Sequence, residues 1–143
     1  MLFYLFTYFS ISARVQYEKC PDQKNQHFII KKFDVNHPGG SRGVTLSISI
    51  VAELNHKVQA PYIEGQIISD RIPVLRFHDT LCKPGVLICP ASFSQLVYGN
   101  QIPIPSTIEP GEYKLRLIFR EGKEKLSCYE TPITIRGTKE EKK

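Results

Sequence analysis

Hydrophobic residues alternate with mostly polar ones along several stretches of this chain. From Val44 to Leu54, every second side chain is aliphatic, and the intervening positions carry Thr, Ser and Glu with one Val. A period of two over this length is typical of a β-strand with one buried face. The same alternation runs between Gly111 and Gly122, and a third stretch from Lys125 to Ile135 follows it as the second half of a predicted hairpin. Pro132 removes a backbone donor there, which predicts a sheet edge or a bulge.

Shorter segments complete an all-β pattern. We expect strands at His27–Phe33, Tyr62–Ile68 and Ser92–Gly99, and extended chain at Ile72–Phe77. The ten prolines oppose long helices, and no helical period of ten residues or more is present. Six or seven short strands without helices predict a two-sheet β-sandwich.

The two ends of the chain differ from this pattern. Residues 1–13 carry no charge and are nearly all apolar or small, although Lys and Arg are absent near Met1. The apolar run is shorter than the roughly 20 residues that cross a bilayer, so we interpret it as a secretory signal cleaved after Ser12 or Ala13. A buried N-terminal strand is the alternative. The domain then spans residues 14–136, and residues 137–143 form a flexible charged tail.

Length, composition and charge narrow the class of protein. The chain has 143 residues, 41% of them hydrophobic, which suits one globular domain. A formal net charge of +5 is compatible with an anionic membrane surface or an acidic partner, and is too small and too scattered to indicate nucleic-acid binding.

Four cysteines fit disulfides better than a metal site. In a secreted chain they are expected to pair, and four cysteines allow three pairings. Cys82 and Cys89 flank the turn dipeptide Pro84-Gly85, so they can approach each other across a short loop. Cys20 is then left to pair with Cys128. The spacing is too wide for the C-x₂₋₄-C pairs of structural zinc sites, and we expect no metal and no cofactor.

The second half of the chain resembles the MD-2-related lipid-recognition (ML) domain family. The resemblance covers Ile72–Ile135 and rests on a cysteine loop ending in Cys-Pro, an aromatic strand end, an Ile-Pro-Ile-Pro stretch, a Pro-Gly-x-Tyr turn and a C-x-E-x-P string. The cysteine loop contains Cys82, Gly85, Cys89 and Pro90, and the aromatic strand end is Tyr98. The Ile-Pro-Ile-Pro stretch is Ile102–Pro105, and the turn contains Pro110, Gly111 and Tyr113. The C-x-E-x-P string contains Cys128, Glu130 and Pro132. Members of the family pair their cysteines in the arrangement given above.

The resemblance implies an immunoglobulin-like β-sandwich of about seven strands with an apolar cavity between its sheets. From the sequence alone, the inward-facing apolar residues of the predicted strands are expected to form an ordinary packed core. The resemblance to the family instead implies that they line a cavity. The candidate wall residues are Leu46, Ile48, Ile50, Leu115, Leu117, Phe119, Tyr129 and Ile133. The candidate mouth residues are Tyr62, Ile63, Phe77 and Tyr98.

The expected function is therefore a lipid-binding or lipid-transfer protein. It would hold a sterol or a phospholipid and move it between membranes or present it to a partner, such as a membrane-protein acceptor. Four cations are expected at or beside the mouth loops, for transient contact with an anionic membrane: Lys57, Arg71, Arg76 and Lys83. For each of them an ordinary solvated charge is the alternative. We expect a monomer in a secreted or endolysosomal compartment.

A binding module and an enzyme are the competing classes. A solid immunoglobulin-like module would act through protein–protein recognition. Catalytic motifs with a known mechanism are absent from the sequence, and the adjacent His78-Asp79 is interpreted as a surface loop pair rather than an acid–base dyad. We therefore expect no enzymatic activity and assign no catalytic residues.

Overall fold

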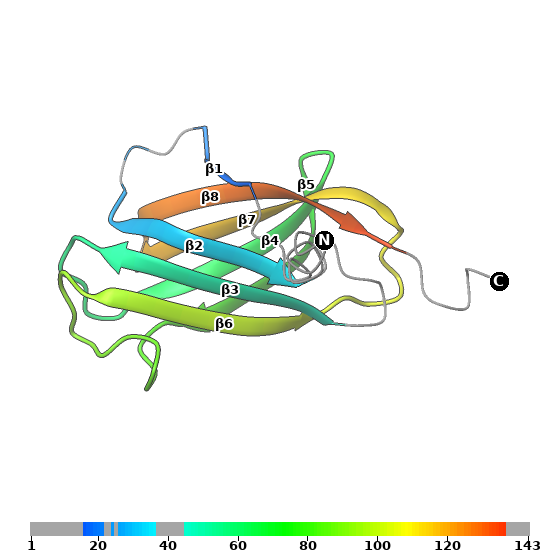
Figure 1. Cartoon of the computed structure of the whole chain (residues 1–143). Helices are drawn as coiled ribbons and strands as arrows, with labels where there is room; N and C mark the ends of the chain where they lie inside the picture. The colour runs from blue at the N-terminus through cyan, green and yellow to red at the C-terminus, as the bar shows by residue number, and fades with distance from the viewer. Residues whose placement is uncertain (1–15, 22–23, 25, 37–44, 137–143) are drawn as a thin grey trace, which may run out of the picture.

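The chain folds into two antiparallel β-sheets packed face to face, as seen in a computed structural model (Figure 1). The structure describes residues 16–21, 24, 26–36 and 45–136, so the predicted signal and the charged tail lie outside the described residues. One sheet has the strand order β1-β8-β7-β4-β5 and the other β2-β3-β6. The strands are β1 (Glu18–Lys19), β2 (Phe28–Asn36), β3 (Thr45–Leu54), β4 (Tyr62–Ser69), β5 (Ile72–Thr80), β6 (Gln95–Pro103), β7 (Gly111–Glu121) and β8 (Glu124–Ile135).

The predicted all-β sandwich is confirmed, with differences at particular strands. Strand β1 was not predicted, because two residues are too few to show an alternation. It pairs Glu18 with Glu130 of β8. Strand β6 begins three residues later than expected because Phe93 adopts a left-handed φ of 50°, which interrupts extended chain. Strand β5 continues past Phe77 to Thr80, so His78 and Asp79 lie in a strand rather than in a loop.

The hydrophobic core fills the space between the sheets. The inward faces of β3 and β7 predicted by the alternation are buried, and Leu46, Leu117 and Phe119 have no exposed surface. Within the described residues no helix forms, and none is therefore long and apolar enough to cross a membrane.

Two disulfides tie the outer parts of the sandwich together, and both predicted pairs are confirmed. Cys20 bonds Cys128, which fastens the segment after β1 to β8 with a Cα–Cα separation of 5.3 Å. Cys82 bonds Cys89 with a Cα–Cα separation of 5.6 Å, and it closes the loop that precedes β6.

Candidate functional site

The two sides of the sandwich are closed to different degrees. Strand β5 is the edge of the larger sheet, and its inward-facing side chains Leu75, Phe77 and Asp79 are only partly buried. Leu75 and Phe77 pack against the core and still reach solvent. Apolar side chains that lie between two sheets and also reach solvent mark a place where the interior is accessible. We call this side the β5–β6 edge, because β6 is the facing edge of the smaller sheet.

Tyr98 links the two sheets across the β5–β6 edge. Its ring is buried with 1% of its surface exposed, and its hydroxyl donates to Asp79 Oδ2 on β5 at 3.1 Å. Asn100 donates to the same hydroxyl at 2.9 Å, and Lys83 forms an ion pair with Asp79 at 2.7 Å. Burial raises the pKa of the Tyr98 phenol above its usual value, and the neighbouring Asp79 charge adds to this effect. The phenol therefore stays protonated and remains a donor.

On the opposite side of the sandwich, β2 faces β8, which has only the two-residue β1 beside it. We call this side the β2–β8 edge, and several hydrogen bonds close it. The Phe28 N–H donates to Ser127 Oγ at 2.9 Å, and that hydroxyl donates back to the Phe28 carbonyl at 3.0 Å. The Tyr129 hydroxyl donates to the same carbonyl at 2.5 Å, and the His27 N–H donates to the Leu126 carbonyl at 3.0 Å. Burial also raises the pKa of Tyr129.

A glycine in the middle of β4 creates the space that Phe77 occupies. Gly65 pairs with Phe77 across β4 and β5, and a Cβ atom at Gly65 would lie 2.0 Å from Phe77 Cε1. The phenyl ring therefore occupies the space that a Cβ atom at Gly65 would need, on the inner side of the edge strand. Any larger residue at position 65 would push the ring away from this place.

The disulfide loop forms one boundary of the β5–β6 edge. The Val97 N–H of β6 donates to the Val86 carbonyl at 3.3 Å, and Leu87 is buried in the core. Ile88 and Phe93 instead project into solvent, with 83% and 80% of their surfaces exposed. The loop is thus anchored to the sandwich by one set of side chains and presents another outward.

The predicted wall residues all lie in the interior. Each is at most 5% exposed and belongs to the single large core cluster: Leu46, Ile48, Ile50, Leu115, Leu117, Phe119, Tyr129 and Ile133. A cavity wide enough for water would leave the side chains around it measurably exposed, so in this structure these residues pack against one another. Their role as a lipid-contacting wall stays a prediction.

The predicted mouth residues are only partly brought together. Ile63, Phe77 and Tyr98 face the space between the sheets, where Ile63 is fully buried. Tyr62 lies on the outer face of β4, because neighbouring residues of a strand point to opposite sides, and its hydroxyl donates to the Gly122 carbonyl at 3.1 Å. With Arg76 and others it lines a surface depression of about 500 Å³ on the outside of the sheet.

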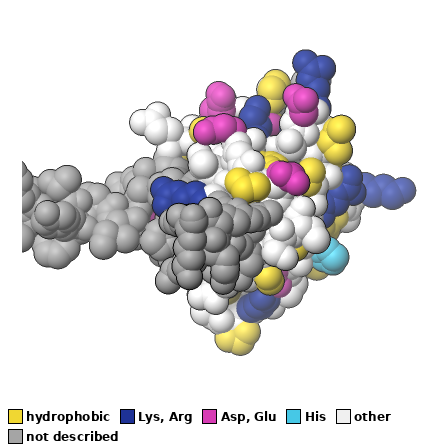
Figure 2. Space-filling model, turned by 90° about the vertical axis from the view of Figure 1, so that its right-hand side faces the viewer, with side chains coloured by type: hydrophobic (Ala, Val, Ile, Leu, Met, Phe, Trp, Pro, Cys, Tyr) yellow, Lys and Arg dark blue, Asp and Glu magenta, His cyan; other side chains and the backbone are white. Residues whose placement is uncertain are grey.

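The four cations expected near the mouth do not form one patch. Lys57 and Lys83 lie at the end of the sandwich that carries the disulfide loop, whereas Arg71 lies in the β4–β5 turn at the other end, and Arg76 points outward from the middle of β5. Figure 2 views the end at which β8 finishes, where hydrophobic, basic and acidic side chains of the described residues are interspersed.

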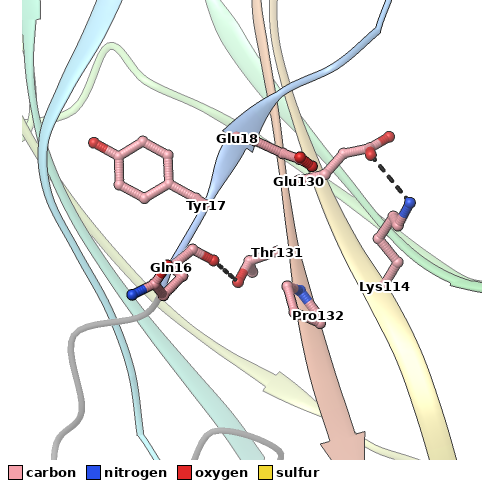
Figure 3. A pocket seen from close by; sticks show the side chains of 7 residues that line it. All are labelled: Gln16, Tyr17, Glu18, Lys114, Glu130, Thr131 and Pro132. Carbon is pink, nitrogen blue, oxygen red and sulfur yellow. Dashed lines mark hydrogen bonds and ion pairs between the residues drawn. The ribbon is translucent and has the colours of Figure 1, made fainter.

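Glu130 of the C-x-E-x-P string has a structural environment. The carboxylate is buried, and it forms ion pairs with Arg116 Nη2 at 2.7 Å and with Lys114 Nζ at 3.3 Å. Figure 3 shows Glu130 and Lys114 beside a groove of about 320 Å³ at the β1 edge of the larger sheet, which Tyr17 and Thr131 also line. Because its charge is fully paired with neighbouring cations, Glu130 fastens β8 to β7 and is not a free site for chemistry.

The sequence reasoning missed Asp79, Asn100 and Gly65 as parts of the β5–β6 edge. Extending the alternation of β5 by two residues places Asp79 on the same face as Phe77, so the signal for Asp79 was present. His78 falls on the opposite face, so the two adjacent residues do not form an acid–base pair. Asn100 lies two residues after Tyr98 in the same strand, so the alternation already placed the two side chains on one face. The clearance at Gly65 depends on which strands are neighbours, and the sequence pattern does not state this.

Comparison with known proteins identifies the family. Among solved structures, a Niemann-Pick type C2 protein from Japanese carpenter ant superposes with a TM-score of 0.68 at 16% identity, over 85% of this chain and 99% of that chain. The C-terminal domain of wzt gives a TM-score of 0.61 at 12% identity, over 85% of this chain and 81% of that one. Chicken MD-1 complexed with lipid IVa gives a TM-score of 0.49 at 21% identity, over 82% and 87% of the two chains. These likenesses concern the fold. A search of curated proteins finds no match. A family model described as ML domain matches residues 14–135, and the chain therefore belongs to the ML-domain family.

Proposed function

We propose that this protein binds a lipid between its two sheets and admits it through the β5–β6 edge. The observation that carries the proposal is the state of Leu75 and Phe77, which are part of the core and yet partly exposed at a sheet edge. Membership of the ML-domain family supports an apolar ligand. The opening movement is a rotation of the smaller sheet about the hydrogen-bonded β2–β8 edge.

The chemistry of the interior favours hydrocarbon over polar ligands. Leu46, Ile50 and Leu117 offer only methyl and methylene groups to a ligand. Each methylene transferred from water to such a site is worth about 0.8 kcal/mol, so a sixteen-carbon chain gains roughly 12 kcal/mol before the costs of ordering. Wall side chains that separate from one another are covered again by the lipid, so little apolar surface is left exposed to water.

A sterol and a phospholipid both fit this scheme. In each case the polar group would remain at the β5–β6 edge, where Asp79, Lys83 and Asn100 offer acceptors and donors. The two lipid classes differ in the size of the polar group, and that group would lie outside the sandwich. The proposed role is binding followed by transfer between membranes or presentation to a partner, without catalysis.

The disulfide loop is the proposed membrane contact. Ile88 and Phe93 are largely exposed, and Val97, which lines a surface depression together with Ile88, is 47% exposed. Large apolar side chains clustered on a surface are typical of contact with a membrane or another protein. The Cys82–Cys89 bond holds this loop next to the β5–β6 edge, so the apolar tip can touch a bilayer while the edge faces it. The two disulfides also support an oxidising compartment, either secreted or endolysosomal.

A solid module for protein recognition is the second candidate. It is favoured by the complete packing of the predicted wall residues, which leaves the interior filled in this structure. On that hypothesis the exposed Ile88 and Phe93 would contact a protein surface.

Lipid extraction of the purified protein distinguishes the two candidates. We expect mass spectrometry of the extract to find one lipid per chain, and the delipidated protein to take up a fluorescent sterol or phosphatidylglycerol from vesicles. An extract without lipid, together with no uptake of either probe, would favour the solid module.

A further inference from the structure

Two histidines and a glutamate meet at one end of the sandwich, on the β2–β8 side. His27 directly precedes β2, His56 follows β3 by two residues, and Glu124 is the first residue of β8. Their nitrogen and carboxylate oxygen atoms that could act as ligands all lie within 4.8 Å of one another. The three residues are far apart in the sequence and come from both sheets.

Backbone hydrogen bonds hold the three segments in this arrangement. The Asn55 N–H donates to the His27 carbonyl at 2.9 Å, which extends the pairing of β2 and β3 up to the residue before His56. The His27 N–H donates to the Leu126 carbonyl at 3.0 Å, which fixes His27 relative to the start of β8. The backbone that carries His27 is thus held against the segment before His56 and against the start of β8.

The imidazole rings of His27 and His56 stack on each other. Their centroids are 3.9 Å apart and their planes differ by 21°. Both rings are partly buried, and Glu124 is exposed. The lipid-binding account does not use these residues, and they lie on the edge that it treats as the hinge.

We propose that His27, His56 and Glu124 form a binding site for a divalent transition metal ion such as Zn²⁺. Two imidazole nitrogens and one carboxylate oxygen are a donor set that Zn²⁺ accepts, with water as the fourth ligand. Ligand atoms around a tetrahedral Zn²⁺ lie about 3.3 Å apart, given bond lengths of about 2.0 Å. Binding therefore draws the three groups together by small side-chain rotations. The two stacked rings also tilt, because parallel nitrogen lone pairs do not converge on one ion.

Binding at this site would join the two sheets. His27 and His56 flank strands of the smaller sheet and Glu124 belongs to the larger one, so the ion would strengthen the β2–β8 edge. Lysines next to these residues in the sequence, at positions 57, 123 and 125, oppose a cation. We therefore expect micromolar rather than nanomolar affinity, together with a rise in melting temperature in the presence of Zn²⁺.

The test uses the chain without a histidine tag, at neutral pH. Zn²⁺ is titrated by calorimetry, and Co²⁺ is titrated by visible absorbance to report the coordination geometry. We expect one ion per chain in the unaltered protein, and at least a tenfold loss of affinity in each of H27A, H56A and E124Q. The matched control is H78A, since His78 lies on the outer face of β5 away from the site. This variant should bind as the parent does.

Stability measurements keep the test decisive if a variant folds poorly. The unaltered protein should melt at a higher temperature with Zn²⁺, and a chelator should reverse the shift. The proposal is overturned if no saturable binding or melting shift occurs in the unaltered protein, or if well-folded H27A and H56A variants bind as tightly as the parent.

Discussion

Removing the Tyr98 hydroxyl tests whether the β5–β6 edge controls lipid uptake. In Y98F the ring still fills the core, and the hydrogen bond to Asp79 across the two sheets is lost. A hydrogen bond to a charged acceptor contributes about 1.5–3 kcal/mol. We take the lower value, because Asp79 keeps its ion pair with Lys83 and is 21% exposed. About 1.4 kcal/mol corresponds to a tenfold change in an equilibrium constant.

The assay is stopped-flow uptake of a fluorescent sterol from vesicles by the delipidated protein. If separation of β5 from β6 limits uptake, Y98F should take up the probe roughly tenfold faster than the unaltered protein. The matched control is Y129F, which removes the buried hydrogen bond from Tyr129 to the Phe28 carbonyl at the β2–β8 edge. This variant should lose about 1 kcal/mol of stability and show no faster uptake.

Two results would refute this reasoning. One is an uptake rate for Y98F within twofold of the parent, which would mean that the Tyr98–Asp79 link does not restrict opening. The other is equal acceleration in Y98F and Y129F, since a general loosening of the sandwich would then explain both. Urea unfolding of each variant supplies the stability values needed for the comparison.

Variants at Gly65 and Phe93 and the pH dependence of stability test other parts of the proposed site. G65A should lower the free energy of unfolding, measured in urea, by about 1–3 kcal/mol, because its Cβ would meet the Phe77 ring at 2.0 Å. G65A/F77L should recover part of this loss, and an equal loss in both variants would contradict the steric explanation. F93N, which keeps a side chain tolerated at positive φ, should reduce binding to anionic vesicles about tenfold or more; unchanged sedimentation with vesicles would exclude the loop as the contact. Burial raises the pKa of both Tyr98 and Tyr129 in the folded protein, so these phenols ionise first in the unfolded chain and stability should fall as pH rises above about 10. Tyrosinate absorbance should show a late phase that is absent from the Y98F/Y129F double variant. A stability that stays unchanged above that pH would contradict the assignment.

The strand pattern was predictable where one face of a strand is buried and the other is exposed. In β3 and β7 the aliphatic positions recur every second residue, and these strands appear at almost the expected bounds. The start of β6 was not predictable, since the left-handed conformation of Phe93 leaves no sign in the alternation. Strand β1 is held by pairing with β8 and by the Cys20–Cys128 bond, both of which join segments more than a hundred residues apart.

The candidate site was only partly predictable for a similar reason. Phe77 and Tyr98 were expected near one another, and they lie on the two strands that form the β5–β6 edge. Tyr62 was also expected at the mouth, but the face on which its side chain lies depends on register, which a shift of one residue reverses. The contribution of Gly65 depends on the position of a ring from another strand, so no local pattern reveals it.

Photo-crosslinking of a bound lipid tests the central claim most directly. A sterol or fatty acid that carries a diazirine group would be loaded into the protein, irradiated and located by peptide mass spectrometry. The account predicts labels on residues that face the interior, such as Ile50 and Leu117, and on Phe77 at the β5–β6 edge. Labels confined to Tyr62 and His78 in the outer depression would contradict it, because the lipid would then lie on the surface of the sheet and not between the sheets.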